Sequence, residues 1–154
     1  KTALVQYCSM SHGASLFRKT IFDDVGVFDT RLDFAEDYDL GCRGAVLGKV
    51  YTNLQESLTL YRNHPGQIGV QKRQLQYERD LAIKRKYMSA LMGGESVGLL
   101  PEFLSLGSRF KSKDVAQRVL AQCMGTIIRL ARRVHHEPTF INIINSCIAR
   151  HLLA

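Results

Sequence analysis

The densest group of side chains able to do chemistry lies in residues 34–40, Phe-Ala-Glu-Asp-Tyr-Asp-Leu. Glu36 and Asp37 place adjacent carboxylates where a loop is expected to enter a helix. The first backbone N–H groups of a helix lack partners and can hold an anion there. A carboxylate so placed can accept a proton from a hydroxyl or bind a metal ion. The structural alternative, which these residues alone favour, is helix-end charge plus a salt bridge.

Asp39 has a more specific structural explanation than its two acidic neighbours. It stands four residues before Arg43, so the two side chains are expected to meet on one helix face as an ion pair.

Four segments, taken in order, resemble the C-terminal half of the catalytic domain of family-2 glycosyltransferases, which have the GT-A fold. The resemblance spans about residues 10–69. The segments are Gly13–Arg18, Val25–Asp29, Glu36–Leu40 followed by Arg43, and Leu60–His64. Each segment alone is a weak signal, whereas the ordered set of four is fairly specific.

The resemblance implies transfer of a sugar from a nucleotide-sugar donor to an acceptor hydroxyl, with inversion. Asp37 would be the general base that deprotonates the acceptor, and Glu36 would orient the acceptor or Asp37. An inverting single displacement needs such a base on the face opposite the leaving nucleotide, within hydrogen-bond reach of the attacking oxygen.

The resemblance also implies roles for residues outside the acidic pair. His64 would help to hold a divalent metal, Mn²⁺ or Mg²⁺, on the diphosphate, and Arg62 would face the diphosphate or the acceptor. The small-residue loop bordering the sugar would be Gly13, Ala14 and Ser15. Structural alternatives stay open: a turn at Gly13, an ion pair for Arg62 and a surface-loop position for His64.

The chain departs from the family in having no N-terminal nucleotide-binding half that ends in an Asp-x-Asp motif. Residues 1–12 are too short for a βαβ unit, which needs about 30 residues. We therefore expect the C-terminal fragment of a larger enzyme, inactive alone and binding its metal only with the missing half. The acceptor would be a glycan or a lipid-linked sugar.

The elements expected before residue 70 are mixed. Apolar and β-branched runs predict short strands, and a Gly-terminated pattern predicts short helices. The expected strands are 3–8, 14–18, 49–52 and 57–62, and the expected helices are 20–25, stopped by Gly26, and 36–47, ended by Gly48.

Helical spacing dominates after Gly69. The expected helices are 71–92, a short piece from Pro101 to Leu106, a long helix capped by Ser112 or Asp114 and running to Val134, and a last one from Pro138. The expected fold class is α/β: the C-terminal portion of a GT-A-type mixed-sheet domain over residues 1–70, then a mostly α-helical C-terminal region over residues 71–154.

Charge is distributed unevenly between these two parts. Residues 1–70 carry seven Lys/Arg and eight Asp/Glu, whereas residues 71–154 carry fourteen and six. The basic helical region is expected to be a solvated face or to bind a membrane surface; nucleic acid is disfavoured because no recognised motif is present. The alternative function is thus a non-catalytic basic module that binds a membrane or a protein. The apolar stripes at 116–134 and 140–152 are expected to pack together or to form a homo-oligomer contact.

Composition is that of an ordinary globular domain, with 154 residues, 45% hydrophobic and 23% charged. No apolar run approaches the roughly 20 residues of a membrane span. The four cysteines form no Cys-x-x-Cys pair, which removes support for a structural zinc site. Free thiols in a reducing compartment are favoured over disulfides. The expected location is cytoplasmic, with peripheral membrane association.

Overall fold

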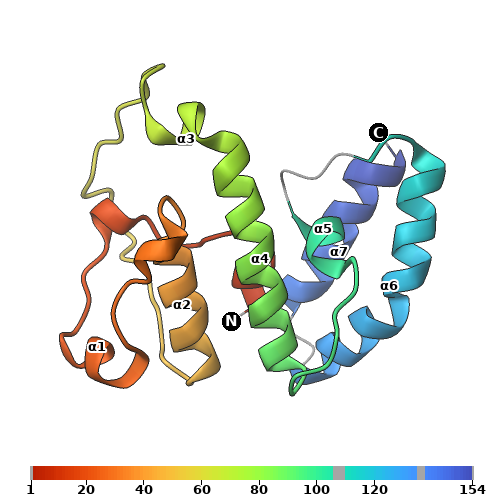
Figure 1. The fold of residues 1–154 in the computed structure, drawn as a ribbon, viewed down its shortest axis with the longest axis horizontal. Coiled ribbons are helices and arrows are strands. Elements are labelled where there is room, and N and C mark those ends of the chain that lie inside the picture. The colour runs from red at the N-terminus through yellow and green to blue at the C-terminus, as the bar shows by residue number, and fades with distance from the viewer. Residues whose placement is uncertain (1, 106–109, 135–137, 154) are drawn as a thin grey trace.

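A computed structural model describes residues 2–105, 110–134 and 138–153, and every regular element within those ranges is helical (Figure 1). The predicted α/β class with a GT-A-type mixed sheet is therefore wrong for this structure. The expected strand 3–8 begins as a 3-10 turn, and 14–18, 49–52 and 57–62 form no strand. A β-prone segment becomes a strand only when a neighbour pairs with its backbone groups, and the described residues supply no such neighbour.

The helical predictions hold much better than the strand predictions. The helices are α1 (Thr20–Val25), α2 (Glu36–Val46), α3 (Ile68–Gln71), α4 (Arg73–Leu91), α5 (Leu100–Leu104), α6 (Lys113–Arg133) and α7 (Pro138–Ile148). Short 3-10 turns cover Thr2–Val5, His12–Ala14 and Thr30–Leu32, and a π-helical turn covers Ala149–Leu153. No helix within the described ranges combines the length and the apolar character that a bilayer crossing requires.

The predicted helix boundaries rest on identifiable caps. Gly26 ends α1 with a φ of 85°, a left-handed conformation that glycine adopts without strain. Ser112 caps α6, because its hydroxyl accepts a hydrogen bond from the backbone N–H of Val115 at 3.3 Å. The predicted helix 71–92 is broken at Lys72, which separates α3 from α4. Leu106, the predicted end of the short helix that begins at Pro101, lies outside the described residues.

Helix α4 is the centre of the molecule (Figure 1). Helix α2 packs on one side of it, and α5 and α6 pack on the other. The N-terminal turn Thr2–Val5 contacts α2, α4 and α7, and Tyr38 of α2 donates a hydrogen bond from its hydroxyl to the Leu4 carbonyl. The predicted contact between the two C-terminal stripes holds in part, since α6 packs on the turn Ala149–Leu153 while α7 packs mainly on α5 and Thr2–Val5.

The cysteines lie in the apolar core as free thiols, which confirms the thiol prediction over disulfides. Cys42, Cys123 and Cys147 are buried, and Cys8 is half-buried. Burial raises the pKa of the Cys8 and Cys123 thiols to about 11 and raises that of Cys42 and Cys147 as well. Thiols with a raised pKa stay protonated and are poor nucleophiles, so these cysteines act as small apolar side chains.

One cation of the basic region is part of the core rather than of the surface. Lys84 of α4 is 1% exposed. Its ammonium group pairs with Asp80 one turn earlier and donates a hydrogen bond to the Ser105 hydroxyl at 3.2 Å. Burial lowers the pKa of Lys84, and the neighbouring Asp80 carboxylate opposes that shift. A buried cation of this kind depends on its partner, because an unpaired charge in the core is costly.

We expect substitution of Asp80 to lower the unfolding free energy more than substitution of Lys84. Asp80→Asn leaves Lys84 buried beside an uncharged amide and should cost about 3 kcal/mol of unfolding free energy. Lys84→Met should cost about 1 kcal/mol, because Met fills similar space and Asp80, whose side chain is 24% exposed, regains water. Urea unfolding followed by circular dichroism measures both values. Equal losses in the two variants would contradict the buried position of Lys84.

Candidate active site at the start of helix α2

The backbone turn before α2 is held in an unusual conformation by helix α4. Phe34 has a φ of 73°, and it is the one described non-glycine residue with a positive φ. Gln76 donates a side-chain hydrogen bond to the Phe34 carbonyl at 3.0 Å, and the Arg79 guanidinium donates one to the Asp33 carbonyl. Strained backbone persists only where its surroundings fix it, and it is common at functional sites. The turn delivers Glu36 and Asp37 directly into the first turn of α2.

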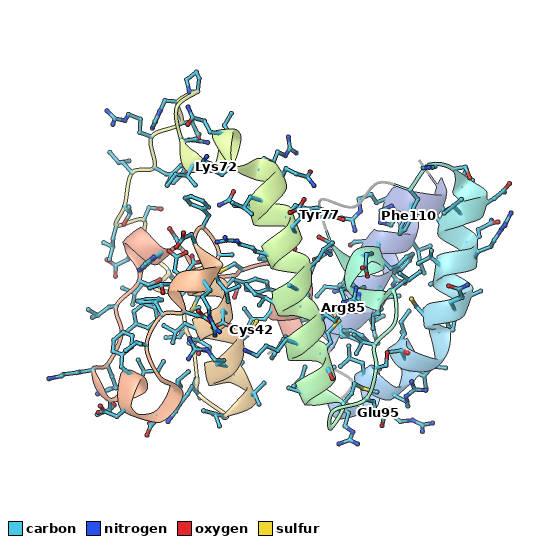
Figure 2. The ribbon with its side chains drawn as sticks, in the orientation of Figure 1. Cys42, Lys72, Tyr77, Arg85, Glu95 and Phe110 are labelled. Atoms are coloured by element: carbon cyan, nitrogen blue, oxygen red, sulfur yellow. The ribbon has the colours of Figure 1, made fainter. Side chains whose placement is uncertain are left out.

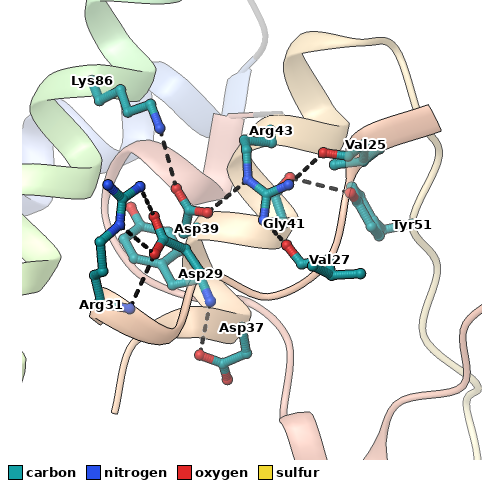
Figure 3. A network of polar contacts seen from close by, with 11 residues as sticks. Val25, Val27, Asp29, Arg31, Asp37, Asp39, Gly41, Arg43, Tyr51 and Lys86 are labelled. Atoms are coloured by element: carbon teal, nitrogen blue, oxygen red, sulfur yellow. Dashed lines mark hydrogen bonds and ion pairs between the residues drawn. The ribbon is translucent and has the colours of Figure 1, made fainter. Parts of the chain in front are cut away.

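Asp37 is the residue of the acidic cluster whose carboxylate makes no ion pair among the described residues. It is half-buried, and its Oδ1 accepts a hydrogen bond from the backbone N–H of Tyr38 at 2.7 Å. No cation pairs with it within the described ranges. Figure 3 shows Asp37 at the edge of the polar network, where its carboxylate makes this one hydrogen bond and meets no cation among the residues drawn. A carboxylate at a helix N-terminus with a free oxygen can accept a proton from a bound hydroxyl.

Asp39, two residues later, is fully committed to internal contacts. It is 2% exposed; Arg43 Nε lies 2.6 Å from its Oδ2, and Lys86 Nζ lies 3.7 Å from its Oδ1 (Figure 3). The predicted ion pair between Asp39 and Arg43 is confirmed. The same guanidinium donates hydrogen bonds to the carbonyls of Val25 and Val27, the latter at 2.8 Å. Arg43 therefore ties the end of α1 to α2.

Glu36 reaches the predicted small-residue loop through His12. Its Oε1 lies 3.7 Å from His12 Nδ1, and its Oε2 is buried with no hydrogen-bond partner among the described residues. His12 opens the turn that contains Gly13 and Ala14, and the Ser15 hydroxyl donates to the Ser11 carbonyl at 2.6 Å. A Cβ added to Gly13 would meet nothing within 4 Å, so the loop borders open space.

Phe28 and Asp29 support this loop. The Phe28 ring lies 4.9 Å from the His12 ring and 5.9 Å from the Phe22 ring, measured between centroids. Asp29 caps the turn Thr30–Leu32 and pairs with Arg31, whose guanidinium holds the pKa of the Asp29 carboxyl well below its usual range. Both residues therefore have structural roles in positioning His12 and the chain before Phe34.

Arg62 and His64 are not brought to Asp37 in this structure. Both lie in the exposed stretch 52–66, and the His64 backbone N–H donates to the Gln67 side chain at 3.3 Å. No described contact joins either residue to Glu36, Asp37 or the loop 13–15. Within the described ranges no three His, Cys, Asp or Glu side chains gather to hold one metal ion, and both Asp39 oxygens already face cations. The metal predicted at His64 was expected only together with an N-terminal half, so it stays a prediction.

A cleft of about 260 Å³ runs between α2 and α4 and was not predicted. Its walls are mostly apolar, with the Asp39 network on its rim. The lining residues include Cys42, Val46, Leu47, Ile83, Tyr87 and Ala90. Lys86, whose side chain is 68% exposed, is the cation of the rim most open to water. The cleft is suited to an apolar group that carries an anionic end.

Most basic residues of the stretch 71–87 have partners within the chain. Arg79 and Lys84 contact Asp33 and Asp80, as described above, and Lys86 faces Asp39. Arg85 pairs with Glu102 and donates to the Gly98 carbonyl. Lys72 and Arg73 are exposed at the break between α3 and α4, as Figure 2 shows for Lys72. Most basic side chains of this stretch therefore make ion pairs or hydrogen bonds within the chain, and few of them contribute to a continuous basic surface.

Sequence reasoning missed the residues that act over long separations. His12 meets Glu36, and Gln76, Arg79 and Lys86 reach α2 or the turn before it, across 24 to 47 positions of sequence. Neither helix periodicity nor local spacing carries a signal for such contacts, because both describe neighbours within about two turns.

Comparisons with known proteins give no relative, since no family model, curated protein or solved structure matches the chain. The family resemblance of the four segments thus stays a hypothesis based on these residues alone.

The two aspartates of the site are expected to differ sharply in their effect on stability. Asp39→Asn leaves Arg43 without a counter-charge and should cost about 2–4 kcal/mol of unfolding free energy. Asp37→Asn keeps an oxygen for the Tyr38 N–H and should change the stability by less than about 0.5 kcal/mol. Thermal and urea unfolding of the two isosteric variants measure this difference. A larger loss for Asp37→Asn would contradict the assignment.

Proposed function

We propose that this chain is the acceptor-side part of an inverting glycosyltransferase, in which Asp37 accepts the proton of the attacking acceptor hydroxyl. The acceptor oxygen would then form the new glycosidic bond at the anomeric carbon while the bond to the nucleotide diphosphate breaks. The proposal rests on the ordered set of segments between residues 10 and 69 and on the state of the acidic cluster. It does not rest on the sheet fold that the resemblance implied.

The observation that supports it best is that Asp37 and Asp39 differ in whether their carboxylate oxygens are free. A general base needs a free oxygen that a substrate can reach, and Asp37 has one. Asp39 lacks this property because Arg43 and Lys86 occupy both of its oxygens. Asp37 is therefore the better candidate of the two for proton transfer.

Glu36 has the contacts of a positioning residue in this proposal. It links the start of α2 to His12 and so to Gly13, Ala14 and Ser15, the proposed border of the sugar site. Its Oε2 is buried, so Glu36 would act by holding His12 and the loop in place. The acceptor would thus be held between the loop and the first turn of α2.

A lipid-linked acceptor is favoured over a free glycan by the cleft between α2 and α4. Its apolar walls would hold part of the lipid, and Lys86 on its rim would face a phosphate. Cytoplasmic location with peripheral membrane association is the setting in which such an acceptor is met. The nucleotide-sugar would be bound mainly by the rest of the enzyme, and Arg62, His64 and a divalent metal enter no step derived from these residues.

The test is Asp37→Asn in the longest natural form of the enzyme, assayed for transfer from labelled nucleotide-sugars to a lipid or glycan acceptor. Loss of the base should lower kcat by at least about 100-fold with little change in acceptor KM. Asp33→Asn is the matched control, since this exposed acid sits just before the strained turn and makes no described side-chain contact. It should keep nearly full activity.

Full transfer by Asp37→Asn would contradict the proposal. It would favour the second candidate, a non-catalytic module that binds a membrane surface or a protein through α4 and α6.

A further inference from the structure

Residues 55–63 form an exposed segment whose apolar side chains have no cover in the described structure. Leu58 is 69% exposed, Leu60 is 101% exposed and Tyr61 is 73% exposed. The segment runs without helix on the side of the molecule away from α6 (Figure 1). No hydrogen bond joins a backbone group of residues 50–63 to another described residue. A polypeptide with open backbone groups and exposed leucines is a template for pairing with another strand.

The order of side chains in this segment is amphipathic at the period of a strand. In an extended conformation Glu56, Leu58, Leu60 and Arg62 share one face, because alternate residues of a strand point the same way. The other face then carries mainly polar side chains, from Gln55 to Asn63. One face thus presents two leucines between an acid and a base.

That order is complementary to itself when two copies run antiparallel. With Thr59 opposite Thr59, Leu58 lies opposite Leu60 of the second copy, and Glu56 lies opposite Arg62 of the second copy. The pairing occurs twice, so the ribbon has four leucines in contact and an ion pair at each end. Opposite charges and apolar pairs directly across a ladder are favourable. We propose that two copies of this chain associate through residues 55–63 as an antiparallel two-stranded ribbon.

The alternative pairings of two copies are worse for physical reasons. A parallel ribbon places Glu56 opposite Glu56 and Arg62 opposite Arg62, and like charges directly across are unfavourable. A slip by one residue puts the leucines of the two strands on opposite faces. Pro65 has no N–H group, so the ladder ends shortly after Asn63. The charge order therefore selects one register.

The association should be weak, because a ribbon of two short strands is marginal by itself. We expect a dissociation constant of about 10–100 µM, in the range of small transient interfaces. Sedimentation velocity of the 154-residue chain from about 1 µM to about 300 µM brackets that value. The mass should rise from 17.4 kDa toward twice that value. A chain that stays monomeric over this range would overturn the proposal.

Charge reversal tests the register as well as the association. Glu56→Arg and Arg62→Glu each place like charges across both ends of the ribbon and should weaken the dimer about tenfold. The double variant restores opposite charges and should recover the wild-type constant. An equimolar mixture of the two single variants should form a mixed dimer, since their charges match.

Two further variants keep the test independent of folding and of catalysis. Leu58→Lys with Leu60→Lys should abolish the dimer, whereas Leu54→Lys, at a leucine 71% exposed and outside the ribbon, should leave it intact. Circular dichroism should be unchanged in all variants, because these side chains are exposed. Dimers that persist after single charge reversal, or that the double variant fails to restore, would refute the ribbon. Because the readout is mass, the outcome is distinct from that of the transferase assay.

Discussion

The buried ion pair between Asp39 and Arg43 is the contact on which the candidate site depends. It places a carboxylate that is 2% exposed against a guanidinium at 2.6 Å. The guanidinium has five N–H donors in a fixed plane, so it can bind the carboxylate and the carbonyls of Val25 and Val27 together. Three stretches of chain are thereby held at fixed positions: the end of α1, the loop after it and the middle of α2. Lysine could not replace arginine here, since it lacks that geometry.

Helix α4 supplies the second half of the same framework. Gln76 and Arg79 fix the strained turn before α2, and Lys86 lies beside Asp39. Lys84 of the same helix is anchored in the core with α5 through Asp80 and Ser105. A helix that reads as a basic surface in the sequence is therefore the element that positions the acidic cluster. Because both Asp39 oxygens face cations, Asp37 is the aspartate that we propose as the base.

Interactions between residues close in the sequence made many of the helix boundaries predictable. Caps and glycines at Gly26 and Ser112 gave correct helix ends, and the spacing of Asp39 and Arg43 gave a correct ion pair. The four predicted strands failed because β propensity records only that a segment fits a sheet, whereas a strand also needs a partner from elsewhere. The burial of Lys84 was equally invisible, since it follows from how α4 and α5 pack.

The candidate site was predictable to the same extent. Sequence placed Glu36 and Asp37 at the first turn of a helix, and the structure brings the loop 13–15 beside Glu36. It does not bring Arg62 or His64 to them, and every residue of the stretch 52–66 is exposed. The exposed leucines of that stretch are explained by our proposal that it pairs with the same stretch of a second copy, whose charges lie in the complementary order.

The most direct test of this account is a pair of double-mutant cycles on the free energy of unfolding. One cycle combines Asp39→Asn with Arg43→Gln, and the other combines Asp37→Asn with Arg43→Gln. The account predicts a coupling of about 1–3 kcal/mol for the first pair and less than about 0.5 kcal/mol for the second. Equal couplings, or a larger one for Asp37, would show that Asp37 is itself an internal ion-pair partner and would contradict its assignment as the free carboxylate.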